Sequence, residues 1–106
     1  MPKLSQITGD RIRHTRKMLG FDTLHFAYVI GVHGSTISRW ELRGPEHLRI
    51  EPASLALLVA LNSYLARIDK QPSKLEVFRT ELLTEILTGG SLRAIHCLLR
   101  HYFEDK

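Results

Sequence analysis

Hydrophobic residues recur along most of the chain at the three- and four-residue spacing of amphipathic helices. The first such segment runs from about Asp10 to Leu19 and is followed by Gly20, a residue that commonly ends a helix. Its inward stripe consists of Ile12, Thr15, Met18 and Leu19. The pattern therefore predicts an N-terminal helix over about residues 10–19.

Two short helices are predicted next. Asp22 is a favourable N-cap for the second helix, and Gly31 ends it. The apolar residues Phe26, Ala27 and Ile30 make up its inward face. A third helix is expected over about residues 34–42. Only a few residues separate the two, so they must be joined by a sharp turn.

A fourth helix is predicted from Pro52, which suits a first helical turn, to about Ile68. Residues 55–61 are apolar nearly all round, so we expect this part to be buried on more than one side. Asp69-Lys70-Gln71-Pro72 reads as a linker. These features place a boundary between residues 1–68 and residues 69–106.

The C-terminal segment predicts a helical hairpin. Ser73 and Glu76 have the spacing of a capping box for a fifth helix, which Gly89 would close. Ser91 can cap a sixth helix over residues 92–103. The expected fold is therefore all-α, with five to six helices, and the hairpin packed on the first part.

Positive charge is concentrated in the first half of the chain. The whole chain carries a formal net charge of +4. Residues 1–50 contain eight Lys and Arg against four Asp and Glu, whereas residues 51–106 contain seven of each class. A surface that binds phosphate, if there is one, is therefore expected in the first half.

The sequence gives little support for metal binding, catalysis or membrane insertion. Cys97, His101 and His96 share one predicted helix without a second cluster, which does not make a closed zinc site. No nucleophile and base set, phosphate-cradling glycine loop or carboxylate pair is recognisable, so neither enzymatic activity nor a cofactor is predicted. No apolar run has the length of a membrane span, and a single cysteine without a signal peptide indicates the cytoplasm.

The stretch from Asp22 to Glu41, DTLHFAYVIGVHGSTISRWE, resembles the helix-turn-helix of the XRE family, which includes the lambda-like phage repressors. The resemblance covers roughly residues 9–68, and its most specific part is Ser-Thr-Ile-Ser-Arg-Trp-Glu. It implies a lambda-repressor-like fold and a bacterial or phage-encoded, nucleoid-associated protein. Ile37 and Trp40 would face inward, with Trp40 in the core.

The resemblance also implies roles for individual residues. Residues that match Gly34, Ser35, Ser38 and Arg39 read base edges in the major groove. Those that match Thr23 and Thr36 hold phosphates, and Arg13, Arg43 and Arg49 are weaker phosphate candidates. Glu41 and Arg16 match a structural ion pair. The sequence departs from the family at Gly34, where a long polar or basic residue is common, and in residues 43–51, where the loop looks longer.

The hairpin raises the question of a partner, because two helices cannot bury both of their apolar stripes. A homodimer is favoured, through the inward positions Leu75, Phe78, Leu82, Ile86, Ile95, Leu99 and Tyr102. The hairpin could instead complete a monomeric core. The function expected is a DNA-binding transcriptional regulator, a repressor acting as a homodimer on an inverted repeat. The alternative is an antitoxin-like module whose C-terminal helices bind a partner protein while it autoregulates its operon.

Overall fold

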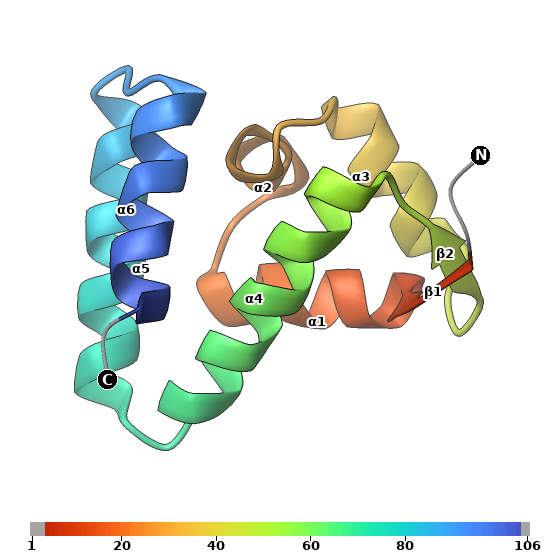
Figure 1. Cartoon of the computed structure of the whole chain (residues 1–106), viewed down its shortest axis with the longest axis horizontal. Coiled ribbons are helices and arrows are strands. Elements are labelled where there is room, and N and C mark those ends of the chain that lie inside the picture. The colour runs from red at the N-terminus through yellow and green to blue at the C-terminus, as the bar shows by residue number, and fades with distance from the viewer. Residues whose placement is uncertain (1–3, 105–106) are drawn as a thin grey trace. The chain divides into compact units, whose positions relative to one another are not determined.

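The computed structural model describes residues 4–104. Over these residues the chain contains six helices, which include 73% of the residues, and one small two-stranded sheet. The all-α prediction is therefore confirmed in outline (Figure 1). The elements in chain order are β1 (Leu4–Thr8), α1 (Gly9–Leu19), α2 (Thr23–Ile30), α3 (Gly34–Leu42), β2 (His47–Arg49), α4 (Pro52–Ile68), α5 (Pro72–Leu87) and α6 (Leu92–Glu104).

The chain divides into two compact units, with the division inside α4. The N-terminal unit extends to Val59, and the C-terminal unit begins at Ala60. The sequence placed this boundary at the linker after residue 68. The last turns of α4 belong with the hairpin instead.

The helix ends of the N-terminal unit lie where the sequence places them. Asp22 caps α2, because its Oδ1 accepts a hydrogen bond from the backbone N–H of His25 at 2.7 Å. Gly20 and Gly31 follow α1 and α2 with φ angles of 73° and 90°. This left-handed conformation is costly for other residues. The chain therefore turns sharply after each of these helices.

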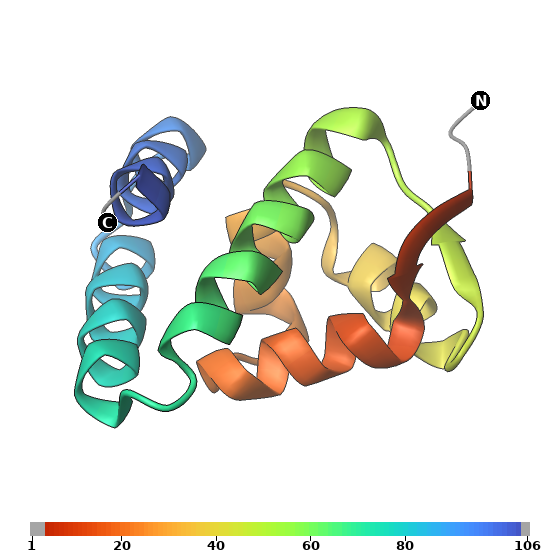
Figure 2. The same cartoon turned by 60° about the horizontal axis from the view of Figure 1, so that its bottom comes forward.

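The two-stranded sheet is absent from the sequence prediction. β1 and β2 pair antiparallel, with an irregular register, and lie side by side in Figure 2. The buried Ser5 joins them, since its hydroxyl donates a hydrogen bond to the carbonyl of Leu48 at 2.7 Å. Leu48 and Ile50 are buried, whereas Arg49 between them is exposed. Residues 43–51, which looked like a long loop, thus supply a turn and a strand.

The start of α1 is held against this same turn. The backbone N–H of Asp10 donates to the carbonyl of Gly44 at 2.8 Å. A Cβ added to Gly9 would lie 2.2 Å from the carbonyl oxygen of Trp40, so no larger residue fits without movement of the backbone. The sheet and turn therefore fix the N-terminal end of α1 beside the end of α3.

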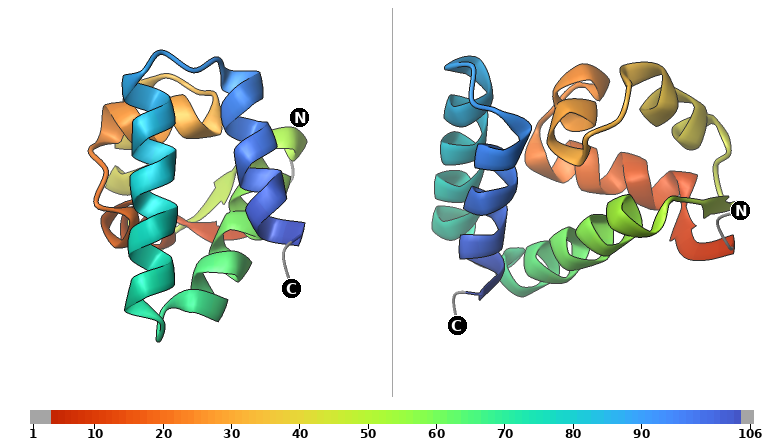
Figure 3. Two further views of the ribbon diagram at one scale, coloured as in Figure 1. Left: turned by 90° about the vertical axis from the view of Figure 1, so that its left-hand side faces the viewer. Right: turned by 45° about the horizontal axis from the view of Figure 1, so that its top comes forward.

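The C-terminal unit contains the last part of α4 and an antiparallel hairpin of α5 and α6, seen side by side in Figure 3. Aromatic rings pack within it. The ring of Tyr64 lies 5.0 Å from that of Phe78 and 5.9 Å from that of Tyr102, measured between centroids. Ser91 caps α6 as predicted, with its Oγ accepting from the backbone N–H of Ala94 at 3.1 Å.

Two local predictions for these helices are wrong. The capping box of Ser73 and Glu76 does not form, because Pro72 occupies the first turn of α5 and Ser73 is already helical. Glu76 pairs with Arg79 instead. The middle of α4 is also less buried than expected, since Val59 is 49% exposed. No helix of the described residues has the length and apolar character to cross a membrane.

Candidate nucleic-acid interface

Helix α3 has two chemically distinct faces. Ile37 is fully buried, and Glu41 is only 7% exposed. Ser35, Ser38 and Arg39 are exposed. The inward face thus attaches α3 to the N-terminal unit, and the outward face presents two hydroxyls and a guanidinium to solvent.

Helix α2 and the turn that follows it set the position of α3. Ala27 is 1% exposed, which leaves room only for a small side chain where the two helices pack. The backbone N–H groups of Gly31 and Val32 both donate to its carbonyl, at 2.8 and 3.0 Å. These hydrogen bonds end α2, and α3 begins three residues after Gly31. The short connection predicted from the sequence is present.

Gly34 lies at the first position of α3 and is half-buried. A Cβ added there would meet Leu24 Cδ1 at 3.7 Å, an ordinary contact distance. The structure therefore does not demand glycine at this position. The missing side chain shortens the outward face at its N-terminal end, where the resembled family often carries a long polar residue.

A carboxylate between two arginines holds α3 against α1. Arg16 donates to both oxygens of Glu41, from Nε at 2.7 Å and from Nη2 at 2.8 Å. The ion pair predicted from the sequence is present and bidentate. Arg16 also donates through Nη1 to the carbonyl of Phe21 at 3.0 Å, so it ties the turn after α1 to the same point.

The electrostatic effect of this cluster is mutual. The hydrogen bonds from Arg16 hold the pKa of Glu41 below its ordinary value, against the opposing effect of burial, and Arg13 adds to the lowering. The bond to Glu41 correspondingly raises the pKa of Arg16. The charged forms of both groups are therefore favoured by folding.

Arg13 has a different position from the one expected. The sequence made it a candidate phosphate contact, whereas its Nε lies 3.2 Å from Glu41 Oε1 and completes the cluster. Its side chain remains 47% exposed. The sequence contained a signal for this arrangement, because Arg13 and Arg16 are three residues apart on one helix and so share a face.

The two threonines expected to hold phosphates are both half-buried. Thr23 is the first residue of α2, next to its capping Asp22. Thr36 accepts a hydrogen bond from Arg39 Nη2 at 3.3 Å. This bond orients the Arg39 side chain along the outward face of α3, one turn from its own backbone.

Three arginines gather where the end of α3 meets the sheet. A hollow of about 480 Å³ is lined by Leu4, Arg39, Trp40, Arg43, His47, Leu48 and Arg49. Arg43 Nε pairs with Glu46 at 2.5 Å, and both side chains are largely exposed. Arg49 is exposed on β2. The sequence named these arginines separately and gave no sign that they share one surface.

Trp40 and His47 also line this hollow. Trp40 was expected in the core, but it is half-buried, because its side chain borders the hollow beside the sheet. Nδ1 of His47 lies 3.0 Å from the carbonyl oxygen of Ser5. Since a carbonyl oxygen only accepts, Nδ1 carries the proton and His47 helps to hold β1 in place.

The residues expected at a dimer interface fall into two groups. Phe78, Leu82, Ile95 and Leu99 are at most 1% exposed in the single chain, so they offer no surface to a second copy. Leu75, Ile86 and Tyr102 are half-buried. The inward stripes of the hairpin are therefore largely satisfied within one chain, as in the monomeric alternative.

Among residues 4–104, no three His, Cys, Asp or Glu side chains come together as a metal site. Cys97 is exposed on α6.

The chain matches no protein-family model, no curated protein and no solved structure. The case for function therefore depends on the geometry of the site and on the motif from Asp22 to Glu41.

Proposed function

We propose that the protein is a sequence-specific regulator that binds double-stranded DNA, with α2, the turn at Gly31 and α3 as a helix-turn-helix. The observation that carries this proposal is the division of α3 into two faces. Glu41 and Ile37 anchor one face, while Ser35, Ser38 and Arg39 project from the other without packing in the core. A short polar face of this kind suits insertion into the major groove.

Arg39 is the main candidate for base recognition. A guanidinium can donate two hydrogen bonds to O6 and N7 of a guanine, a contact worth about 1–3 kcal/mol of discrimination. Its bond to Thr36 at 3.3 Å limits the conformations open to the side chain before DNA arrives. Ser35 and Ser38, with their short hydroxyls, allow α3 to approach the base edges closely.

The hollow beside α3 supplies the phosphate contacts in this proposal. Arg43 and Arg49 line this hollow together with Arg39. The ion pair of Arg43 with Glu46 is exposed, so it is weak enough for Arg43 to bind a phosphate instead. The β1–β2 sheet carries Arg49 to this position. Phosphate binding by the sheet and its turn would fix the angle at which α3 enters the groove.

The proposal is tested by selection of bound duplexes from a random pool, followed by titration of the selected site. We expect one sequence to be enriched, with an affinity that falls steeply with salt as counterions are released. Arg43→Gln and Arg49→Gln should each weaken binding by a similar factor on all sequences and reduce the salt slope by about one. Arg39→Ala should instead relax discrimination at one base pair.

The matched control is Arg93→Gln on α6, an exposed arginine outside this surface, which should change neither affinity nor salt slope. A pool without an enriched sequence, or an affinity insensitive to salt, would contradict the proposal. Equal losses of affinity from Arg93→Gln and Arg43→Gln would show that binding depends only on the overall charge of the chain and not on this surface.

We further propose that the regulator acts as a homodimer on an inverted repeat and represses transcription. This part depends on the family resemblance, since paired half-sites about 34 Å apart are typical of such proteins. Its interface would have to use side chains other than the buried Phe78, Leu82, Ile95 and Leu99. Light scattering coupled to size exclusion measures the mass directly. A monomer that binds one asymmetric half-site would overturn the dimer and leave DNA binding intact.

A further inference from the structure

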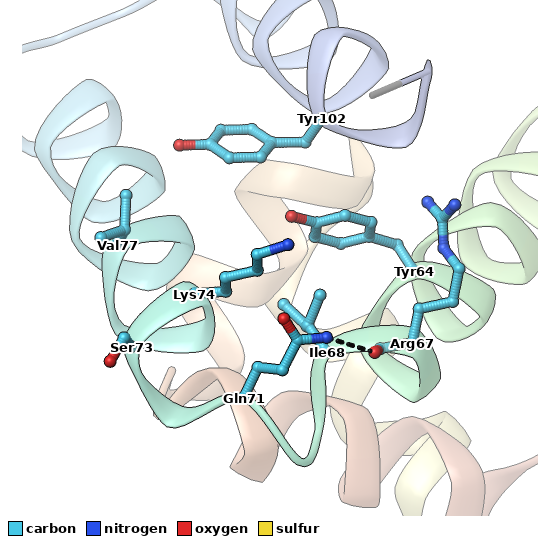
Figure 4. A pocket seen from close by; sticks show the side chains of 8 residues that line it. All are labelled: Tyr64, Arg67, Ile68, Gln71, Ser73, Lys74, Val77 and Tyr102. Carbon is cyan, nitrogen blue, oxygen red and sulfur yellow. Dashed lines mark hydrogen bonds between the residues drawn. The ribbon is translucent and has the colours of Figure 1, made fainter. Parts of the chain in front are cut away.

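We propose that the C-terminal unit contains a binding site for a small organic anion with a flat aromatic body. A cavity of about 380 Å³ lies between the end of α4, the start of α5 and the end of α6. This volume is within the range of small-molecule sites. Eight residues line it: Tyr64, Arg67, Ile68, Gln71, Ser73, Lys74, Val77 and Tyr102 (Figure 4).

The inner part of the cavity is apolar and well packed. Tyr64 and Ile68 are 7% and 4% exposed, so they form a stable floor. The Tyr64 ring is held on its other sides by Phe78 and Phe103, at centroid distances of 5.0 and 5.7 Å. The tilted ring of Tyr102 forms a wall. The Tyr64 and Tyr102 rings already pack on each other, at a centroid distance of 5.9 Å, so a planar apolar group would lie against their outer edges.

The outer part of the cavity is positively charged. Arg67 and Lys74 both line it, and no carboxylate does. Within the described part of the chain, Lys74 has no ion-pair partner, and Figure 4 shows its side chain reaching from α5 toward the two tyrosines. A ligand with a negative group at this end would give Lys74 the partner that it lacks.

Arg67 is exposed and already makes two contacts within the C-terminal unit. Its guanidinium lies 5.3 Å from the centre of the Tyr64 ring, and Nη2 donates to the carbonyl of Phe103 at 3.3 Å. The remaining donors of this guanidinium can bind an anion with little further ordering. The cavity therefore combines one cation that has existing contacts and one without an ion-pair partner, beside an apolar floor.

These two features together define the ligand class. An inorganic anion would contact the cations but not the rings, and a neutral ring would contact the rings without using either cation. An aromatic carboxylate can do both, with its ring against the edges of Tyr64 and Tyr102 and its carboxylate at Lys74, while Arg67 adds positive charge from the far side of the Tyr64 ring. The inference does not depend on DNA binding and concerns a different unit of the chain.

The test is calorimetric titration of the full chain with 2-naphthoate and with its neutral analogue 2-naphthamide. We expect naphthoate to bind at least about tenfold more tightly, because its contacts with both cations are charge-assisted. Equal binding of the two compounds would overturn the anionic part of the proposal. No binding of either at millimolar concentration would overturn the site itself.

Variants then locate the site. Lys74→Gln should weaken naphthoate binding about tenfold and leave naphthamide binding unchanged, whereas Lys70→Gln, in the turn outside the lining, should change neither. Val77→Trp should block both compounds by filling the cavity from a position that is 52% exposed, and circular dichroism verifies that it folds. Equal effects of Lys70→Gln and Lys74→Gln, or undiminished binding to a folded Val77→Trp, would contradict this location.

Discussion

The two units are stabilised internally by different chemistry. In the described residues the buried polar and charged side chains, Ser5, Thr15 and Glu41, all lie in the N-terminal unit. There Glu41 joins α1 to α3 through Arg16 and Arg13. The C-terminal unit is instead packed around the rings of Tyr64, Phe78, Tyr102 and Phe103.

This difference matters for function because the two kinds of contact constrain geometry differently. A bidentate arginine–carboxylate pair requires defined distances and angles, so it fixes how α3 lies against α1. Aromatic packing tolerates a wider range of tilts, here from 51° to 76° between ring planes. The directional contact is found in the unit where the orientation of one helix would decide DNA recognition.

The largest expected effect is in the aromatic unit. Phe78 is 1% exposed, so Phe78→Ala removes a buried ring and leaves a cavity. We expect the free energy of unfolding, measured by chemical denaturation, to fall by about 3–5 kcal/mol. Val77→Ala, at the exposed neighbouring position, should cost well under about 1 kcal/mol. Similar losses for the two variants would show that the rings do not form a core.

The next largest effect is expected in the ionic cluster. Glu41→Ala leaves Arg16, whose side chain is 17% exposed, without its carboxylate, and we expect a loss of about 3 kcal/mol in the free energy of unfolding. Glu46→Ala removes an exposed carboxylate paired with Arg43 and should cost less than about 1 kcal/mol. If Glu41→Ala proved as stable as the parent chain, the cluster would not anchor α3.

A smaller effect is expected from acid. The pKa of Glu41 is lower in the folded chain, chiefly because of its bonds to Arg16. Its stabilising contribution is therefore complete above the unfolded-state pKa of about 4.3 and declines as pH falls through the folded value. Unfolding curves between pH 6 and pH 3 should show a steeper loss for the parent chain than for Glu41→Gln. Parallel pH profiles would be inconsistent with the lowered pKa.

The smallest effect on stability is expected on the outward face of α3. Ser35→Ala and Arg39→Ala change exposed groups, so the free energy of unfolding should stay within about 0.5 kcal/mol of the parent value. Specific DNA binding, measured on the selected site, should nevertheless fall. If Arg39→Ala unfolded the chain while Glu41→Ala did not, the two faces of α3 would be assigned the wrong way round.

Local interactions made much of the fold predictable from sequence. The caps at Asp22 and Ser91 and the left-handed glycines Gly20 and Gly31 act within a few residues of themselves, so their positions in the chain are enough to place the helix ends. The capping box at Ser73 failed for an equally local reason, since Pro72 had already begun the helix. The exposed positions of α3 followed from the same helical spacing.

The candidate site was predictable in part. The motif identified Ser35, Ser38, Arg39 and the pair of Arg16 with Glu41. The sequence could not place Arg13 beside Glu41 or Trp40 beside the hollow, because both positions depend on how α1 and the sheet lie around α3.

The sequence by itself determined the helices, their ends and the polar face of α3, because each depends on residues within one or two turns. Tertiary structure alone decided the pairing of β1 with β2, the gathering of Arg39, Arg43 and Arg49, and the cavity lined by Arg67 and Lys74. These features join residues far apart in the chain. Helical periodicity shows that a face is apolar or charged but not which distant segment will lie against it.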